Sequence, residues 1–341
     1  MRKPLGVGLV GAGNIAAHHI LAWQQTEGAT PVAVCRRDEN KVKDFAHKFN
    51  LDWATNYNDL LQRDDIDIID IVLPSGLHAD VGVVSAIAGK HVLVEKPIDV
   101  TLKKADDLIT ACREYDVTLG VVSQYRFMDG MLQMNTVLQE GKLGQLIQGD
   151  AYIKWYRPQS YYDSGAWRGT WELDGGGPFM NQGIHFIDLL LAAMGPVKSV
   201  YAKTKTLAHN IDVEDIGVAI LEFQNGAYGI IEASTATFPG LPAQLDIHGT
   251  KGTMRIEGDK LAFLHIEGEK PERTSDANAG GASNPMDIDV KPFVRQFTDI
   301  IDAVRTKRQP TVSGEVARRP LQLILAIYES SKRGEEILFQ I

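Results

Sequence analysis

The sequence predicts an α/β protein of two domains, in which a parallel sheet is followed by a domain built on an antiparallel sheet. The chain has 341 residues, which is about two domains at roughly 150 residues each. Its first third alternates short apolar runs with amphipathic stretches. Beyond Gly195-Pro196, strand patterns follow one another without helices between them.

The first third contains the alternating strands and helices. Residues 66–73 are a β-branched run that ends at Pro74, as a buried strand does. Asp38 is placed to cap the second helix, and Gly89 to end the third. Strands that alternate with helices of about 10–14 residues indicate βαβ units and a parallel sheet. The predicted strands are 4–10, 30–35, 66–73, 91–94 and 118–122, and the predicted helices are 14–25, 39–49, 78–88 and 102–115.

The pattern changes near Gln124, so we predict a first domain over 1–123 and a second over 124–341. Asn225-Gly226 between two strand patterns is a strong hairpin signal. The polar stretch 268–285 is predicted to be a mobile loop. The remaining predicted strands are 145–156, 197–206, 215–223, 227–237, 243–248 and 252–256. The remaining helices are 129–140, 180–194, 289–306 and 314–333, of which the last two can pack back on the first domain.

The composition excludes several classes of function. Lys and Arg number 35 against 44 Asp and Glu, so a formal charge of −9 gives no general attraction to nucleic acid or acidic membranes. No apolar run reaches about 18 residues, so no membrane span is expected, and residues 4–17 are interpreted as a strand and its turn rather than a signal peptide. The two cysteines exclude a disulfide scaffold and a Cys-rich zinc site, which favours a cytoplasmic location and no metal.

A glycine-rich pattern lies between the first predicted strand and the first helix. Gly11-Ala12-Gly13-Asn14-Ile15-Ala16 fits G-x-G-x-x-[GA]. The first glycine permits a tight turn, the second lets the backbone approach a pyrophosphate, and the helix N-terminus attracts the anion. The alternative is a plain turn without a ligand. We predict a dinucleotide site that includes Gly11, Gly13, Asn14 and Ile15.

Two arginines follow the second predicted strand, where NAD-binding domains usually carry an acidic residue. Arg36 and Arg37 suit a 2′-phosphate instead, because a planar guanidinium donates two hydrogen bonds at once. We therefore expect NADP(H) to be favoured, with NAD(H) as the alternative. In the competing interpretation both arginines are simply solvated. Asp38 is interpreted as a helix cap rather than a ribose ligand.

Two further patterns carry candidate catalytic residues. Glu95-Lys96-Pro97 follows the strand 91–94, and the carboxyl ends of parallel strands are where ligands bind in such sheets. Asn181, His185 and Asp188 are spaced i,i+4 and i,i+3, which places them on one face of a helix. Taken alone, a lysine at a strand end is usually a surface charge, and a lone histidine on a helix is more often a packed structural residue.

Together these patterns resemble the glucose–fructose oxidoreductase/inositol dehydrogenase (Gfo/Idh/MocA) family, over residues 6–333. The most specific parts are E-K-P at 95–97 and GGG-x₃-N-x₃-H-x₂-D at 175–188. The resemblance implies an N-terminal Rossmann domain and a C-terminal α+β domain with a large open antiparallel sheet. It also implies a homodimer or homotetramer formed through that sheet, and hydride transfer between nicotinamide and a sugar-like alcohol.

The resemblance also implies roles for individual residues. Lys96 would lie beside the reacting hydroxyl and the cofactor, and His185 matches the acid/base histidine. Pro97 would hold the lysine loop. The remaining cofactor contacts implied are Pro74, Ser75 (where the family usually has asparagine), His78, Glu95 and Gln124.

One departure from the family pattern concerns position 181. Asn181 stands where many members have an aspartate, although members that resemble nucleotide-sugar 3-dehydrogenases share the N-Q-G-I-H form. This shifts the base role onto His185 and leaves Asn181 as a supporting catalytic residue. Asp188 either orients His185 or only packs locally.

Substrate recognition is assigned to the middle of the chain, which is dense in aromatic residues and arginine. Aromatic faces stack on sugar C–H surfaces or on bases, and arginines bind hydroxyls, carboxylates or phosphates. The alternative is a second-domain core with a salt-bridged rim. The predicted substrate-binding residues are Lys96, Tyr125, Arg157, Trp167, Arg168, Asn181 and His185.

The function predicted is an NAD(P)-dependent oxidoreductase acting on a secondary hydroxyl or ketone of a sugar, sugar acid or nucleotide sugar. A histidine near its ordinary pKa of about 6.5 transfers the proton in both directions, and a lysine ammonium stabilises alkoxide charge. One alternative is an NAD-dependent glycoside-cleaving enzyme on the same scaffold, and another is a non-catalytic dinucleotide-sensing regulator. The predicted partner is a small carbohydrate, with neither nucleic acid nor membrane.

Overall fold

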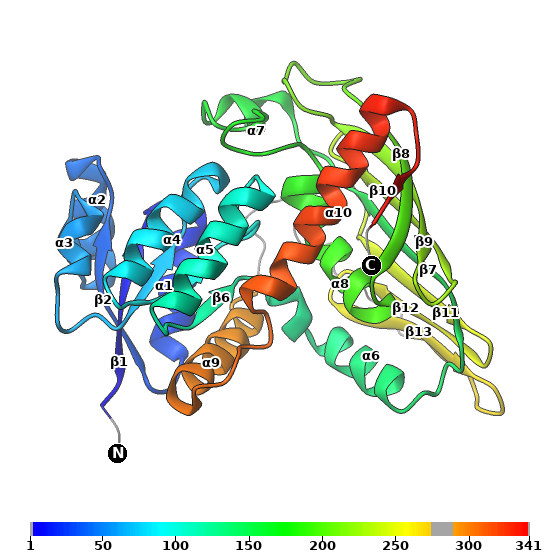
Figure 1. The fold of residues 1–341 in the computed structure, drawn as a ribbon, viewed down its shortest axis with the longest axis horizontal. Coiled ribbons are helices and arrows are strands. Elements are labelled where there is room, and N and C mark those ends of the chain that lie inside the picture. The colour runs from blue at the N-terminus through cyan, green and yellow to red at the C-terminus, as the bar shows by residue number, and fades with distance from the viewer. Residues whose placement is uncertain (1–2, 274–288, 340–341) are drawn as a thin grey trace. The chain divides into compact units, whose positions relative to one another are not determined.

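The computed structural model describes residues 3–273 and 289–339, and it divides into two compact units (Figure 1). The first unit comprises residues 1–124 and 289–318, and the second comprises 125–288 and 319–341. Of the closing helices, α9 (Lys291–Thr306) belongs to the first unit, and the division falls within α10 (Gly314–Arg333).

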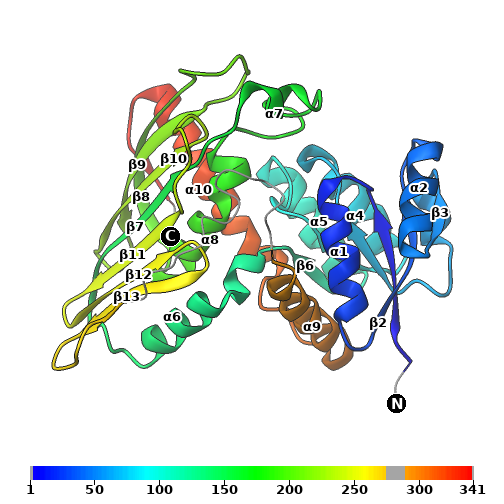
Figure 2. The same ribbon diagram turned by 180° about the vertical axis from the view of Figure 1, so that it is seen from behind.

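The first unit is a six-stranded, wholly parallel sheet in the order β3-β2-β1-β4-β5-β6, as predicted for a Rossmann domain. The order reverses between β1 and β4, and in such sheets this is where ligands bind. Figure 2 shows α1 beside α9, and α4 packs beside α5. The strands are β1 (Leu5–Val10), β2 (Ala29–Cys35), β3 (Asp52–Ala54), β4 (Ile68–Ile71), β5 (His91–Val94) and β6 (Leu119–Val121). The helices are α1 (Asn14–Gln25), α2 (Glu39–Phe49), α3 (Tyr57–Leu61), α4 (His78–Ile87) and α5 (Leu102–Glu114).

Local sequence explains most of these boundaries. Every residue of β4 is buried, which fits the β-branched run that predicted it. The Asp38 side chain accepts a hydrogen bond from the backbone N–H of Lys41 (3.1 Å), so the predicted cap of α2 is confirmed. The strand β3 and the helix α3 were not predicted, because they are short and largely exposed and so lack an apolar period.

The second unit is built on a nine-stranded sheet in the order β14-β13-β12-β11-β7-β10-β9-β8-β15. The sheet is mixed rather than wholly antiparallel, because β10 inserts beside β7 and runs parallel to it. The chain reaches β10 only after a long excursion through two other strands, which allows a parallel pairing. The strands are β7 (Leu146–Lys154), β8 (Val197–Lys205), β9 (Ile216–Phe223), β10 (Tyr228–Ser234), β11 (Gln244–Gly249), β12 (Gly252–Glu257), β13 (Lys260–Ile266), β14 (Glu272–Arg273) and β15 (Ile337–Leu338).

The turns of this sheet show one success and one gap of prediction. β9 and β10 pair as an antiparallel hairpin around Asn225-Gly226, where Gly226 has φ +87°, so the hairpin prediction is confirmed. The strands β13 and β14 were not predicted. Most of the predicted loop 268–285 lies outside the described residues.

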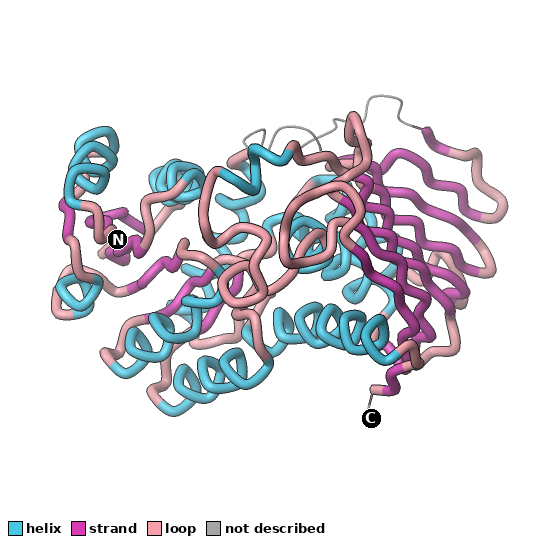
Figure 3. The backbone as a smooth tube through the Cα atoms, turned by 90° about the horizontal axis from the view of Figure 1, so that it is seen from above, coloured by secondary structure: helices cyan, strands magenta, loops and turns pink. Residues whose placement is uncertain are grey.

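The helices of the second unit lie on one side of its sheet, as Figure 3 shows. They are α6 (Asp129–Gln139), α7 (Gln159–Asp163), α8 (Ile184–Met194) and the part of α10 from Arg319 onward. A π-helical turn, Phe179–Gly183, precedes α8, so the helix predicted over 180–194 is α-helical only from Ile184. Among the described residues, no helix is long and apolar enough to cross a membrane.

Candidate functional site

The residues predicted to bind the cofactor follow the carboxyl ends of the strands of the first unit. They come after the five neighbouring strands β2, β1, β4, β5 and β6 of one sheet. A doubly wound sheet binds its ligand at the carboxyl ends of its strands. Gly11, Gly13, Asn14 and Ile15 follow β1, and Arg36 and Arg37 follow β2. Pro74, Ser75 and His78 follow β4, Glu95 and Lys96 follow β5, and Gln124 follows β6.

The glycine-rich turn has the shape that a dinucleotide phosphate requires. Gly11 has φ +116°, and a Cβ there would lie 2.4 Å from the carbonyl oxygen of Val72, so only glycine fits. A Cβ on Gly13 would meet no atom within 4 Å, which leaves open space beside the N-terminus of α1. That helix has no side-chain cap and no acidic residue in its first turn, so its N–H groups suit an anion.

The two arginines after β2 differ in their surroundings. The Arg36 guanidinium is half-buried and its Nη1 donates to the carbonyl oxygen of Ala12 (2.5 Å), within the glycine-rich turn. Arg37 is exposed and makes no hydrogen bond or ion pair within the described residues. Arg36 is therefore tied to the glycine-rich turn, whereas the side chain of Arg37 is exposed.

The loop that carries Lys96 is held on both sides. The Lys96–Pro97 peptide bond is cis. Before it, the Glu95 carboxylate accepts the backbone N–H of Lys96 (2.9 Å). After it, the ring of His78 contacts the carbonyl oxygens of Pro97 (2.7 Å) and Leu73 (2.8 Å). Burial lowers the pKa of His78 despite these carbonyls. The ring lies between the loops that follow β4 and β5, and as a neutral imidazole it donates to one of these two carbonyl oxygens.

A further observation bears on how well this edge fits a cofactor. Gln124 is buried, and its Oε1 has no hydrogen-bond partner within the described residues. An unsatisfied buried amide oxygen at a ligand-binding edge fits a donor supplied by a bound molecule. With the open space at Gly13, it makes the residues present suitable for a nicotinamide dinucleotide.

In the second unit, His185 is stacked on Tyr125. The two rings are 4.4 Å apart at 15°, and both residues are buried. Burial raises the pKa of Tyr125 to about 12, so its hydroxyl keeps its proton. The stack fixes the plane of the imidazole and leaves Tyr125 neutral beside it.

Asn181 lies in the π-helical turn, and this changes the helix-face argument made from the sequence. Its side-chain amide donates to Oδ1 of Asp174 (2.7 Å), whose Oδ2 accepts the backbone N–H of Gly169 (2.8 Å). Asp188 forms a two-pronged ion pair with Arg126, with both distances 2.6 Å. The spacing argument assumed an α-helix throughout, whereas Asn181 lies in the π turn and only His185 and Asp188 lie in α8.

Asp174 was missed by sequence reasoning. It is a buried carboxylate directly before Gly175–Gly177, within hydrogen-bond reach of Asn181. The available signal was its position directly before the glycine run. The family pattern begins one residue later, at Gly175, and so does not include it. Position 181 thus lacks a carboxylate of its own, but one lies against it.

The predicted substrate-binding arginines gather around one tyrosine. Arg168 donates to the hydroxyl of Tyr161 (2.6 Å), and its guanidinium lies over the rings of Tyr161 (4.2 Å) and Trp167 (4.4 Å). Arg157 is buried and lies 5.5 Å from the same Tyr161 ring. Burial lowers the pKa of Arg157 from its ordinary value. Two arginines and an aromatic platform are thus brought together, with Tyr161 at their centre, although Tyr161 was not among the predicted site residues.

A buried glutamate anchors the glycine run before His185. Glu214 accepts the backbone N–H groups of Gly177 (3.0 Å) and Phe179 (3.2 Å) and the hydroxyl of Tyr328 (2.9 Å). A Cβ on Gly177 would lie 1.8 Å from the carbonyl oxygen of Glu214, so the backbone approaches too closely for any other residue. Burial raises the pKa of Glu214 to about 7. Like Asp174 and Tyr161, Glu214 was not among the predicted site residues.

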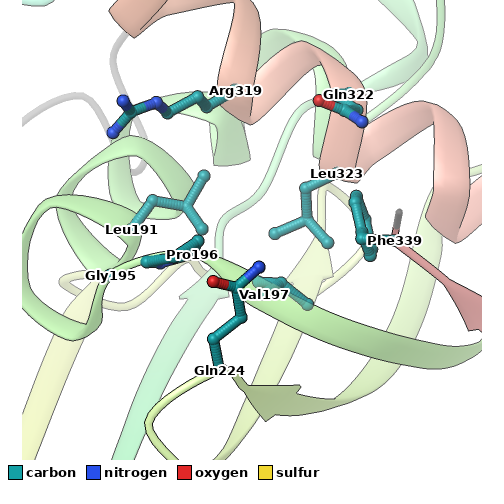
Figure 4. Close-up of a pocket in the computed structure, with 9 residues that line it drawn as sticks. All are labelled: Leu191, Gly195, Pro196, Val197, Gln224, Arg319, Gln322, Leu323 and Phe339. Atoms are coloured by element: carbon teal, nitrogen blue, oxygen red, sulfur yellow. The ribbon is translucent and has the colours of Figure 1, made fainter. Parts of the chain in front are cut away.

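A cavity of about 370 Å³ lies elsewhere in the second unit, between α8, the start of β8, α10 and Phe339 (Figure 4). None of the predicted site residues lines it. Within the described chain, no group of three or more His, Cys, Asp or Glu side chains is arranged to hold a metal ion.

Comparison with known protein families identifies the class of protein. Residues 5–123 match the model of an oxidoreductase family with an NAD-binding Rossmann fold, and residues 131–255 match the GFO/IDH/MocA C-terminal domain. The chain belongs to the GFO/IDH/MocA family of oxidoreductases. The predicted family, fold class and enzyme class are thereby confirmed.

Individual relatives cover almost the whole chain. It is 33% identical to the WlbA dehydrogenase from Bordetella pertussis, solved in complex with NADH and UDP-GlcNAcA, with a TM-score of 0.88 and 100% of both chains covered. It is 30% identical to Oxidoreductase P35 of Formosa agariphila, over 88% of this chain and 99% of that protein. It is 23% identical to the D-apiose dehydrogenase of Paraburkholderia graminis, over 96% of this chain and 88% of that protein.

Proposed function

We propose that this protein transfers a hydride between a nicotinamide cofactor and a secondary hydroxyl or ketone of a sugar, sugar acid or nucleotide sugar. The observation that carries the proposal is the stacked Tyr125–His185 pair in the unit that also holds the Arg157–Tyr161–Arg168 cluster. It offers a proton acceptor together with aromatic and cationic groups suited to a polar ring substrate. The names of the relatives, which include a UDP-sugar complex and a D-apiose dehydrogenase, support the same class.

The proposed chemistry divides between two side chains. The cofactor, when bound, accepts or supplies the hydride. Lys96, on the loop after β5, stabilises negative charge on the substrate oxygen. His185 takes the hydroxyl proton during oxidation and returns it during reduction. Asn181, held by Asp174, is placed to orient the substrate by hydrogen bonds rather than to accept the proton.

The proposed cofactor contacts follow the edge of the first sheet. Gly11, Gly13, Asn14 and Ile15 hold the pyrophosphate, and Arg36 with Arg37 favours NADP(H) over NAD(H). Support comes from the open guanidinium of Arg37 and from the tie between Arg36 and the turn. The nicotinamide end is assigned to Glu95, Lys96 and Gln124, and the connecting part to Pro74, Ser75 and His78.

The protein is further proposed to form a homodimer or homotetramer through the second sheet. Tyr201, Val218, Ile220 and Tyr228 are exposed at 39, 44, 55 and 62%, and Tyr201 lies opposite Ile220 in the sheet register. Apolar side chains gathered on one sheet face are typical of an interface. Ile220→Lys should convert the oligomer to monomer in light scattering after size exclusion, and a wild-type monomer would contradict the assembly.

A cytoplasmic location is proposed on the cysteines. Cys35 and Cys112 are both buried and free, as expected of a chain that works in a reducing compartment.

The decisive experiment is a turnover screen. Sugars, sugar acids and nucleotide sugars are supplied with oxidised NADP or NAD, and reduced nicotinamide is followed by absorbance. We expect net reduction with one substrate class and its loss in Lys96→Ala. Product release without net cofactor change would instead indicate glycoside cleavage, and binding without turnover would indicate a sensor.

A further inference from the structure

A buried ionic cluster joins His19 and Asp70 to Glu95, and no role described above uses His19 or Asp70. His19 on α1 has no exposed surface. Its Nδ1 lies 2.8 Å from Oδ2 of Asp70, and its Nε2 lies 3.0 Å from Oε1 of Glu95. Trp23, one helical turn further on, donates its indole N–H to the same Asp70 oxygen (2.7 Å). Two carboxylates from neighbouring strands thus meet one imidazole.

The geometry determines how many protons the cluster holds. A neutral imidazole donates from one nitrogen only, so its second nitrogen would face a carboxylate oxygen, lone pair against lone pair. The arrangement is satisfied when both ring nitrogens carry protons. Burial opposes the charge, but Asp70 and Glu95 outweigh it and raise the pKa of His19 to about 10. The rings of Phe293 and Phe297, each 5.4 Å from the imidazole, close the site with apolar surface.

Such a cluster is a poor way to stabilise a fold. Replacing a buried ion pair by packed apolar side chains is often neutral or stabilising, because desolvation of the charges costs so much. Here Asp70 even leaves its Oδ1 without a partner among the described residues. The cluster therefore calls for a role other than stability.

The cluster continues to the lysine loop. Glu95 uses Oε1 for His19 and Oε2 for the backbone N–H of Lys96. We propose that His19 is a positioning residue for Lys96, acting through Glu95 to fix the peptide from which the lysine side chain extends. His78 holds the carbonyl oxygen on the far side of the cis bond, so the loop is held at both ends. This inference rests on the proposed role of Lys96 in turnover.

The test is a double-mutant cycle on the full-length protein. kcat with the substrate found in the screen, and the dissociation constant of NADPH, are measured for wild type, His19→Gln, Lys96→Ala and the double variant. We expect His19→Gln to lower kcat by on the order of 10-fold or more, the scale of a misplaced catalytic group, with NADPH affinity retained. In the Lys96→Ala background the same change should cost nothing further, since the two residues act as one unit.

The control is a half-buried histidine of the same unit. His91 lies at the start of β5, and its Nδ1 accepts the backbone N–H of Thr118 (3.0 Å). His91→Gln should leave kcat near that of wild type, even where it lowers stability. If His19→Gln does not fold, Asp70→Asn tests the same cluster from its far end and should lower kcat only when Lys96 is present.

Separate outcomes overturn separate claims. An equal loss of kcat in both backgrounds, or no loss in either, overturns the positioning role. Wild-type kcat in Lys96→Ala overturns the proposed role of the lysine and the inference with it. A nitrogen-detected histidine spectrum at pH 8 adds a readout independent of turnover: both ring nitrogens of His19 should carry protons, and a neutral ring would contradict the cluster.

Discussion

The two units anchor their functional loops by different electrostatic means. In the first, the carboxylates of Asp70 and Glu95 face the protonated ring of His19. In the second, the carboxylate of Glu214 accepts from neutral donors of the described residues, among them two backbone N–H groups and the Tyr328 hydroxyl. Burial acts on both anchors, but a cation offsets it only in the first. The lysine loop should therefore stay fixed across neutral pH, whereas the segment before His185 should respond to pH.

The largest expected effect is at Lys96, whose loop is held by the first of these anchors. Lys96→Ala should lower kcat by on the order of 10²–10³, the scale expected for loss of one group that stabilises a developing oxyanion. NADPH affinity, measured by fluorescence titration, should change little. Lys103→Ala is the matched control, since within the described residues that exposed lysine pairs with Asp107 on α5, away from the lysine loop's contacts. A near-native kcat in Lys96→Ala would remove the lysine from the mechanism.

The second unit is tested next, at its proposed proton acceptor. His185→Ala should lower kcat by at least about 10²-fold, within the usual range for general base catalysis. In wild type, oxidation should rise with pH as the imidazole loses its proton, and reduction should fall. Because Glu214 titrates near pH 7, kcat/KM against pH must also be measured for Glu214→Gln. A profile that flattens in Glu214→Gln but persists in His185→Ala would assign it to the anchor rather than to the base.

A substitution at position 181 tests the electrostatics of the second unit beside its glycine run. Asn181→Asp would place a second carboxylate 2.7 Å from that of Asp174, and like charges so close cannot both ionise easily. We expect activity to be retained, with the pH profile of oxidation shifted to higher pH. Asp174→Asn combined with Asn181→Asp should restore the original profile. An unshifted profile in Asn181→Asp would mean that the two carboxylates do not interact.

A smaller effect concerns cofactor choice in the first unit. Arg37→Ala should weaken NADPH binding by roughly 10-fold, which is the scale of one charge-assisted hydrogen bond. The affinity for NADH should not change. Arg36→Ala should weaken both cofactors, because Arg36 also holds Ala12 in the phosphate-binding turn. Isothermal titration with both reduced cofactors measures the four affinities. Wild-type preference for NADH, or no change in either variant, would contradict the proposed 2′-phosphate contact.

The sequence predicted the parts of this molecule that depend on local pattern. The strand-turn-helix at Gly11–Gly13, the cap at Asp38 and the hairpin at Asn225-Gly226 all follow from residue types at fixed short spacings. Contacts between distant residues were not accessible in this way. His19 and Glu95 are 76 positions apart, and Glu214 and Gly177 are 37 apart, so nothing in the local sequence links them. The π turn before α8 was also missed, since its i→i+5 hydrogen bond, from Gly183 N–H to the carbonyl oxygen of Pro178, leaves no mark in the residue types.

The smallest effect is on stability, and it tests the second anchor directly. The folded-state pKa of Glu214, about 7, lies above its ordinary value of 4.5. A carboxyl group whose pKa is raised by folding contributes stability that is complete below pH 4.5 and is lost as pH rises through 7. The loss is on the order of 3 kcal/mol at most. Glu214→Gln does not titrate, but its amide loses one of the two acceptors that hold the glycine run. The variant should therefore be less stable than wild type at pH 5, and the difference in unfolding free energy should narrow by pH 8.

Asp215→Asn is the matched control: three backbone N–H groups and His209 surround that carboxylate, and these contacts outweigh burial and lower its pKa. The difference in unfolding free energy between wild type and Asp215→Asn should disappear only in acid, well below the range in which Glu214 titrates. Urea unfolding of all three proteins at pH 5 and pH 8 measures these gaps. A constant gap for Glu214→Gln would show that Glu214 does not titrate there, and the contrast between the two anchors would fail.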